Sequence, residues 1–177
     1  MRLEAKQRLQ SFEILPRWVT PSVNLIRSRG DRLNKKGLLE FVHGASNNPD
    51  LTVAYRKQPD ELEFYVFVKG ACQGNVLFAF DQGKKLSQAA KLPVGLAAVP
   101  HTVLSETVRG LGLVSFMYRH VLDRNITLIT DGHTEMAARV WQKVATGSRY
   151  NLYYVKDGSV STEDTPDSFK VLTRKKL

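Results

Sequence analysis

A glycine-containing loop, Arg109-Gly110-Leu111-Gly112-Leu113, most constrains how this chain can fold. It follows an apolar, strand-like stretch at 98–104 and precedes a helix-like stretch at 114–123. Glycine lets the backbone turn tightly and approach a ligand, and the first N–H groups of the following helix, at the positive end of its dipole, favour an anion. The order of strand, glycine loop and helix therefore predicts a pyrophosphate site, although glycine before a helix is also ordinary turn chemistry.

The length of 177 residues suits one domain with a core of its own. The single cysteine, Cys72, cannot form a disulfide within the chain, and no run of about 18 apolar residues is present to span a bilayer. The N-terminal stretch 1–8 mixes charged and apolar residues and lacks the apolar core of a signal peptide. We therefore expect a soluble, cytoplasmic protein without a membrane partner.

Basic residues are in excess and are unevenly distributed. The formal charge is +9, segment 27–36 is rich in Arg and Lys, and three more basic residues occupy 174–176. Such a balance favours anionic partners, so we expect a polyphosphate ligand or an anionic macromolecule bound through segment 27–36. The alternative is a solvated face that keeps the protein soluble, and no nucleic-acid motif decides between the two.

Apolar patterns predict an α/β sandwich rather than a doubly wound sheet. An antiparallel meander is expected at 51–55, 61–68 and 75–80, followed by an apolar segment at 94–104. Pro100 within this segment cannot donate a ladder hydrogen bond, so it marks an edge, a bulge or a local splay. Downstream, helices are expected at 114–123 and 134–144, and strands at 126–130, 152–155 and 169–172.

Residues 1–50 precede this pattern and are more irregular. A short surface helix is expected at 3–13, and residues 22–41 suggest a basic helix broken at Gly30 and Gly37. We expect these fifty residues to form a basic helical extension packed on a domain at 51–177.

The order of elements, with a glycine loop between the fourth strand and the third helix, resembles the GCN5-related N-acetyltransferase (GNAT) family. The family signature Gln/Arg-x-x-Gly-x-Gly/Ala is matched at its first five positions by residues 109–114. The family's Asn-x-x-Ala-x-x-x-Tyr, on the helix after the fifth strand, has a looser counterpart in Thr134, Ala137 and Trp141. The chain is also similar, around 126–144, to small acetyltransferase-like proteins of bacteriophages. The resemblance implies a GNAT-like mixed, mostly antiparallel sheet with helices on both faces.

The resemblance also implies acetyl-coenzyme A as a substrate and supplies its contacts. The pyrophosphate would lie on Arg109, Gly110, Leu111, Gly112 and Leu113, and the pantetheine would run beside Val103 and Leu104, with Trp141 as a further contact. An amine would then attack the thioester directly, and the protein would position it, deprotonate it and stabilise the leaving thiolate.

Two departures from the family pattern bear on catalysis. Val114 stands where the signature has Gly or Ala, and a β-branched residue there stiffens the helix start and crowds the phosphates. Trp141 replaces a tyrosine that protonates the departing sulfur in many members, and an indole N–H is no acid near neutral pH. The enzyme would then use Tyr118, water or no acid at all.

Glu106, Asp131 and His133 are the candidates for the base that deprotonates the amine. Each also has an ordinary reading, Glu106 as a loop charge and Asp131 or His133 as a helix cap. His101 is expected to be a packed core histidine. Cys72 has no histidine arranged nearby, so we expect no cysteine nucleophile. No metal site is expected, because the four histidines are scattered without ligand spacing.

Three function classes remain open on the sequence. The first is an acyl-coenzyme A-dependent N-acyltransferase acting on a protein or small-molecule amine. The second is a catalytically weak or inactive binding or structural protein with the same fold, such as a phage host modulator or a virion component. The third is a nucleic-acid binder that relies on charge alone. The acceptor amine cannot be inferred from the sequence.

Overall fold

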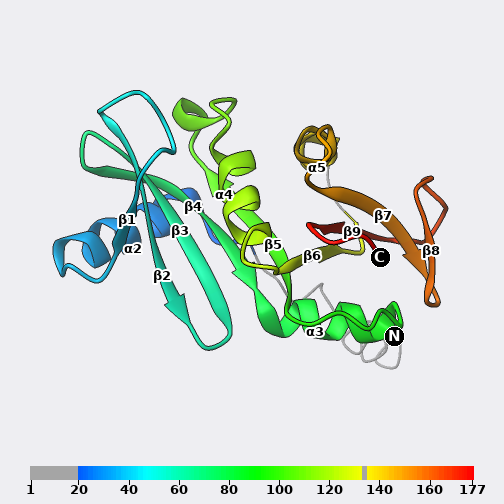
Figure 1. Cartoon of the computed structure of the whole chain (residues 1–177). Helices are drawn as coiled ribbons and strands as arrows, with labels where there is room; N and C mark the ends of the chain where they lie inside the picture. The colour runs from blue at the N-terminus through cyan, green and yellow to red at the C-terminus, as the bar shows by residue number, and fades with distance from the viewer. Residues whose placement is uncertain (1–19, 133–134) are drawn as a thin grey trace, which may run out of the picture.

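The computed structural model describes residues 20–132 and 135–177, and they form a mixed sheet with helices on both faces (Figure 1). The strand order is β1-β2-β3-β4-β5-β6-β9-β7-β8, and every neighbouring pair is antiparallel except β5 and β6. The predicted mixed, mostly antiparallel sheet with helices on both faces is therefore confirmed. The helix expected at 3–13 lies outside the described residues.

The elements follow one another along the chain with short connections. Their bounds are α2 Val23–Lys35, β1 Glu40–Val42, β2 Leu51–Gln58, β3 Glu61–Val68, β4 Ala71–Ala79, α3 Phe80–Ala89, β5 Ala97–Leu104, the 3₁₀ turn η1 Glu106–Val108, α4 Leu113–Leu122, β6 Thr127–Thr130, α5 Glu135–Ala145, β7 Asn151–Lys156, β8 Ser159–Ser161 and β9 Phe169–Thr173.

The predicted meander is confirmed as β2, β3 and β4, whose β-branched and aromatic side chains alternate between two buried faces. The helix α3 connects β4 to β5 and was not predicted from the sequence. Its Gly83 lies against β5, where a Cβ would overlap the Ala97 carbonyl. This close packing explains a glycine inside a helix.

Helices α2 and α3 cover one face of the sheet. Ile26 and Leu33 of α2 pack with Tyr65, Phe67 and Cys72, while α3 contributes Leu86 to a second cluster over β5, β6, β7 and β9. The break expected at Gly30 is wrong, because α2 continues through it. A Cβ at Gly30 would overlap the Cys72 Sγ, so glycine here allows the helix to lie close to β4. The helix does end before Gly37, which has a φ of 68°.

Helices α4 and α5 cover the opposite face and enclose the largest core cluster. Met117 and Val121 of α4 and Trp141 and Val144 of α5 are buried against apolar residues of β2, β3, β4 and β6. On the other side of the molecule, β1 extends the sheet at its edge by pairing with β2. The described part of residues 1–50 therefore packs on the sheet, and the domain boundary at residue 50 stays a prediction.

The sheet opens between β5 and β6. These two parallel strands pair only at Ala97–Thr127 and Ala98–Leu128, whereas β5 stays paired with β4 as far as Leu104. Beyond Ala98, β5 and β6 diverge, and one edge of β5 has no strand partner (Figure 1). Pro100 lies in this stretch, and of the three features that it predicts, an edge, a bulge or a local splay, the structure has the splay.

None of the helices built from described residues is long and apolar enough to cross a membrane.

Candidate functional site

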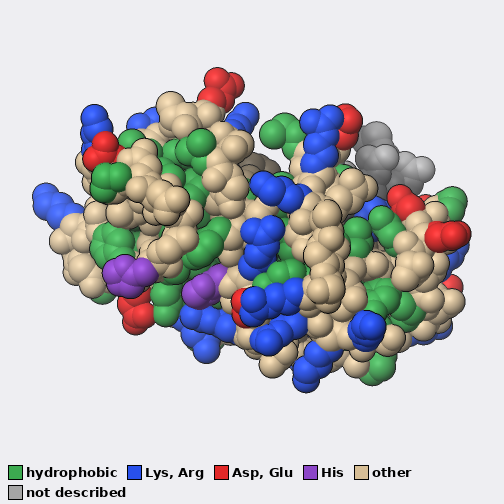
Figure 2. All heavy atoms as spheres, turned by 45° about the horizontal axis from the view of Figure 1, so that its top comes forward, with side chains coloured by type: hydrophobic (Ala, Val, Ile, Leu, Met, Phe, Trp, Pro, Cys, Tyr) green, Lys and Arg blue, Asp and Glu red, His purple; other side chains and the backbone are tan. Residues whose placement is uncertain are grey.

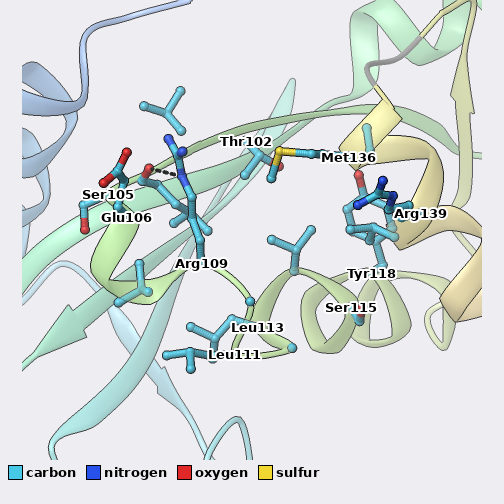
Figure 3. Close-up of a pocket in the computed structure, with 18 of the residues that line it drawn as sticks. Thr102, Ser105, Glu106, Arg109, Leu111, Leu113, Ser115, Tyr118, Met136 and Arg139 are labelled. Carbon is cyan, nitrogen blue, oxygen red and sulfur yellow. Dashed lines mark hydrogen bonds between the residues drawn. The ribbon is translucent and has the colours of Figure 1, made fainter.

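A cavity of about 910 Å³ occupies the opening between β5 and β6. Its walls come from the end of β5, η1, the glycine loop, the first turns of α4 and one face of α5 (Figure 3). Thr20 and Val23, at the start of α2, also line it. Because α2 and α4 lie on opposite faces of the sheet, the cavity passes beside the free edge of β5 from one face to the other.

The glycine loop closes one end of this cavity. Gly110 and Gly112 have φ values of 74° and 77°, in the left-handed region that favours glycine. The first helical bond of α4 runs from the Phe116 N–H to the Gly112 carbonyl at 3.0 Å. The N–H groups of Leu113, Val114 and Ser115 therefore precede the helical hydrogen-bond ladder, where an anion can accept them.

Three cationic side chains line the same cavity, namely Arg109, Arg139 and Lys143. Lys143 Nζ lies 3.9 Å from the point where a Cβ on Gly112 would stand, so the ammonium of α5 reaches the start of α4. Arg109 Nε donates to the Leu104 carbonyl at 3.2 Å, which holds its side chain against the end of β5 (Figure 3). Arg109 of the loop and the two cations of α5 thus bring positive charge to the start of α4.

Tyr118 is the buried titratable group of the site. It lines the cavity from α4, yet its side chain is only 3% exposed. Burial raises the pKa of Tyr118 well above its usual value, and a hydrogen bond with the Trp141 side chain acts in the opposite direction. The rings of Tyr118 and Trp141 meet edge to face at 6.1 Å. The phenol is therefore protonated near neutral pH and can donate a hydrogen bond into the cavity.

Most residues that the sequence singled out line this cavity. They are Val103, Leu104, Glu106, Arg109, Gly110, Leu111, Gly112, Leu113 and Tyr118. Trp141 is buried behind Tyr118 and does not itself line the cavity. Val114 lines it but also packs against the core, so part of its side chain turns away from the loop.

The candidate bases are separated in the structure. Glu106 is exposed on η1 at the margin of the cavity. Asp131 follows β6 and is not among the lining residues, and burial raises the pKa of its carboxyl. His133 lies outside the described residues. The base therefore stays a prediction for all three.

Two other sequence candidates lie away from the cavity lining. His101 is partly buried, with Nε2 2.6 Å from Gln82 Oε1, and burial lowers its pKa to about 4. Burial raises the pKa of Cys72 to about 11, so its thiolate is scarce at neutral pH. Within residues 20–132 and 135–177, no group of three His, Cys, Asp or Glu side chains is arranged to hold a metal ion.

Sequence reasoning missed the contribution of α5 to the cavity. Met136, Arg139, Val140 and Lys143 line it from successive turns of that helix. Their spacing of three and four residues places them on one helical face, and this periodicity was the signal in the sequence. Thr20 and Val23 had no such signal, because they reach the cavity only through the packing of α2 on the sheet.

Comparisons with known proteins add only weak likenesses. No model of a known protein family matches the chain, and no curated protein sequence matches it. Among solved structures, the N-acetyltransferase PseH of Campylobacter jejuni is similar at 11% identity and a TM-score of 0.38, over 67% of this chain and 71% of that one. A chimeric spermidine N-acetyltransferase, SpeG from Vibrio cholerae and hSSAT, matches at 12% identity and a TM-score of 0.38, over 66% and 68% of the two chains.

The microcin C7 self-immunity acetyltransferase MccE, solved with acetyl-CoA and AMP, matches at 11% identity and a TM-score of 0.37, over 64% of this chain and 59% of that one. Likenesses at these scores carry no argument about this chain. The fold rests instead on the strand order, the register and the splay described above.

Proposed function

We propose that this protein is an acyl-coenzyme A-dependent N-acyltransferase that transfers an acetyl group from acetyl-coenzyme A to an amine. The observation that carries the proposal is the cavity at the splay, which joins a cationic glycine loop to the unpaired edge of β5. In acetyl-coenzyme A, the pyrophosphate would suit the cationic glycine loop, and the amides of the pantetheine, which lead to the thioester, would suit the unpaired strand edge. The nature of the amine, on a protein or on a small molecule, stays open.

The residues present fit coenzyme A chemically. Its phosphates would accept the N–H groups at the start of α4 and face the Lys143 ammonium. Val103 and Leu104, on the edge of β5 that β6 leaves unpaired, would offer backbone groups to the pantetheine amides. The volume of about 910 Å³ lies within the range of sites for ligands of this size.

The chemistry forms a C–N bond as the C–S bond breaks, so the amine loses one proton and the sulfur gains one. Glu106, at the margin of the cavity, is the base we favour, with Asp131 and His133 as alternatives. Tyr118 is the donor we favour for the sulfur, because it lines the cavity, burial keeps its hydroxyl protonated, and a hydrogen bond with Trp141 holds it. Acid catalysis of this kind contributes typically 10²–10⁴-fold.

Two measurements test this function. Isothermal titration with acetyl-coenzyme A should show binding, and a thiol-release assay over a panel of amines should show turnover. Absence of binding at millimolar acetyl-coenzyme A would refute the proposal. Binding without turnover on any amine would instead favour the inactive protein with the same fold, as the substitutions at Val114 and Trp141 suggest.

A substitution at Tyr118 tests the proposed acid. Tyr118→Phe removes the hydroxyl and keeps the ring that packs on Phe78 and Trp141. We expect kcat to fall about 10²-fold or more with little change in the Kd of acetyl-coenzyme A. An unchanged kcat would show that water, not Tyr118, supplies the proton to the sulfur.

A cytoplasmic location, a phage origin and a macromolecular partner of segment 27–36 stay predictions.

A further inference from the structure

Four arginines from three segments converge beside the C-terminal end of α4. Arg119 belongs to α4 and Arg124 follows it closely, Arg149 precedes β7, and Arg174 follows β9. We call these four residues the arginine cluster. None of them lines the cavity described above.

Asp123 holds two members of the arginine cluster in place. Arg149 Nη2 lies 3.0 Å from Asp123 Oδ2, and Arg174 Nη1 donates to the Asp123 carbonyl at 3.1 Å. The Tyr150 hydroxyl donates to Asp123 Oδ1 at 2.8 Å. One carboxylate oxygen of Asp123 therefore pairs with Arg149 and the other accepts from Tyr150. This single carboxylate neutralises only one of the four positive charges.

Tyrosine rings lie beneath two of the guanidinium groups. The Arg149 guanidinium lies 5.6 Å from the centre of the Tyr150 ring, and that of Arg124 lies 5.4 Å from the centre of the Tyr55 ring. Contacts of this kind hold a guanidinium group in place over an aromatic ring. One further carboxylate, Glu40, accepts from the Tyr55 hydroxyl at 2.8 Å, which still leaves the arginines in excess.

Basic side chains also gather on the surface of the molecule as a whole. Figure 2 shows Lys and Arg side chains in a band down the middle of the viewed face, with few acidic side chains among them. The whole chain carries a formal charge of +9. A surface of this kind attracts an extended polyanion more strongly than a single anion, because each added phosphate finds another cation.

We propose that the arginine cluster binds the phosphate backbone of a nucleic acid. Guanidinium groups accept phosphate in a bidentate geometry, and such contacts position a nucleic acid without reading its sequence. Binding is therefore expected to depend on salt and to tolerate changes of sequence. The inference is independent of the acyltransferase proposal, since it uses none of the cavity residues.

Fluorescence anisotropy with a labelled 20-nucleotide single-stranded DNA of mixed sequence tests the proposal. Four phosphate contacts predict a slope of about −3 for log K against log salt concentration. The double variant Arg119→Glu with Arg124→Glu should bind at least ten-fold more weakly and show a slope shallower by about 1.4. Arg174→Ala, which removes one exposed cation, should bind about three-fold more weakly, and it gives a second measurement if the double variant is unstable.

A matched control separates the cluster from overall charge. Lys84→Glu with Lys85→Glu changes two exposed cations of α3, on the other face of the sheet, and changes the net charge by the same amount. We expect its affinity to stay within about two-fold of the wild type. The proposal is overturned if this control loses as much affinity as the cluster variant, if poly-glutamate competes as well as DNA at equal charge, or if affinity is independent of salt. Acetyl-coenzyme A binding, measured in the same variants, should be unchanged.

Discussion

At the residue scale, Lys143 belongs to the candidate site although its sequence position does not indicate this. On the sequence it is one basic residue in an amphipathic helix, but in the fold its ammonium lies next to Gly112. The charge of α5 thereby adds to the dipole of α4, and both favour the same anion. The glycine loop had to be considered together with this second helix before its ligand chemistry became specific.

We predict that Lys143→Ala weakens acetyl-coenzyme A binding about ten-fold, which corresponds to about 1.4 kcal/mol. The loss arises because the variant removes a charge-assisted contact to the phosphates. Isothermal titration measures it, and the effect should shrink as salt is added. Lys85→Ala, an exposed lysine of α3 away from the cavity, is the control and should bind like the wild type. Equal affinities in both variants would remove Lys143 from the site.

His101 makes stability depend on pH. Burial lowers its pKa in the folded protein to about 4, below the usual value of 6.5, so the unfolded chain binds the proton more readily. We expect the contribution of His101 to the free energy of unfolding to be fully present above pH 6.5. It should be lost as the pH drops towards 4, by about 3 kcal/mol in total.

Urea unfolding between pH 7.5 and 4.5, compared with the variant His101→Gln, isolates this contribution. The variant cannot titrate at this position, so its free energy of unfolding should fall less steeply over the same range. Identical slopes for the two proteins would show that His101 is not the group responsible. The comparison also cancels the effect of His120, whose pKa burial lowers as well.

At the scale of elements, close approach decides what local propensity does not. Glycine disfavours a helix interior, which is why a break was expected at Gly30, yet α2 is continuous there because it lies directly on Cys72 and Tyr65. Arg29 strengthens the same contact, since it lies 2.5 Å from the buried Glu63 and 2.8 Å from the Tyr65 hydroxyl. Two of the basic residues of segment 27–36, Arg27 and Arg29, thus tie α2 to the sheet.

We predict that Gly30→Ala destabilises the protein by about 1–3 kcal/mol, although alanine is the better helix former. A Cβ there would overlap Cys72 Sγ and approach Tyr65 Cδ1 to 2.8 Å. Chemical denaturation measures the loss, and the double variant with Cys72→Ala should recover part of it. Gly95→Ala, where a Cβ meets nothing within 4 Å, serves as the control and should change stability by less than about 0.5 kcal/mol. Greater stability of Gly30→Ala would contradict the packing argument.

At the scale of the whole molecule, the splay places the site. Strand β5 joins the four strands β1 to β4 on one side to the strands β6, β9, β7 and β8 on the other. Beyond Ala98, β6 separates from β5, and this separation opens the cavity. Pro100 and the glycine loop mark this region in the sequence; the splay is confirmed, and the pyrophosphate site on the glycine loop stays a prediction. The element order, the meander and the amphipathic helices were equally readable, because their periodicities are local.

Acetyl-coenzyme A should protect this junction and little else. We expect slower amide hydrogen exchange at the free edge of β5 and at the start of α4, while amides of the β2–β3 hairpin keep their rates. Exchange followed by mass spectrometry with and without the ligand provides the measurement. Protection confined to the β7–β8 end of the sheet would place the ligand elsewhere.

The sequence by itself determined most of the strands and helices and where the backbone needs glycine, and it predicts an anion site after β5, but it did not predict the helix α3. Hydrophobic periodicity and backbone conformation depend on residues that are neighbours in the sequence, so they can be predicted from the sequence alone. Only the tertiary structure decided that Lys143 meets the glycine loop, that Tyr118 rather than Trp141 lines the cavity, and that Arg149 and Arg174 contact Asp123. Such meetings depend on strand order and helix packing between distant segments, which local patterns do not encode.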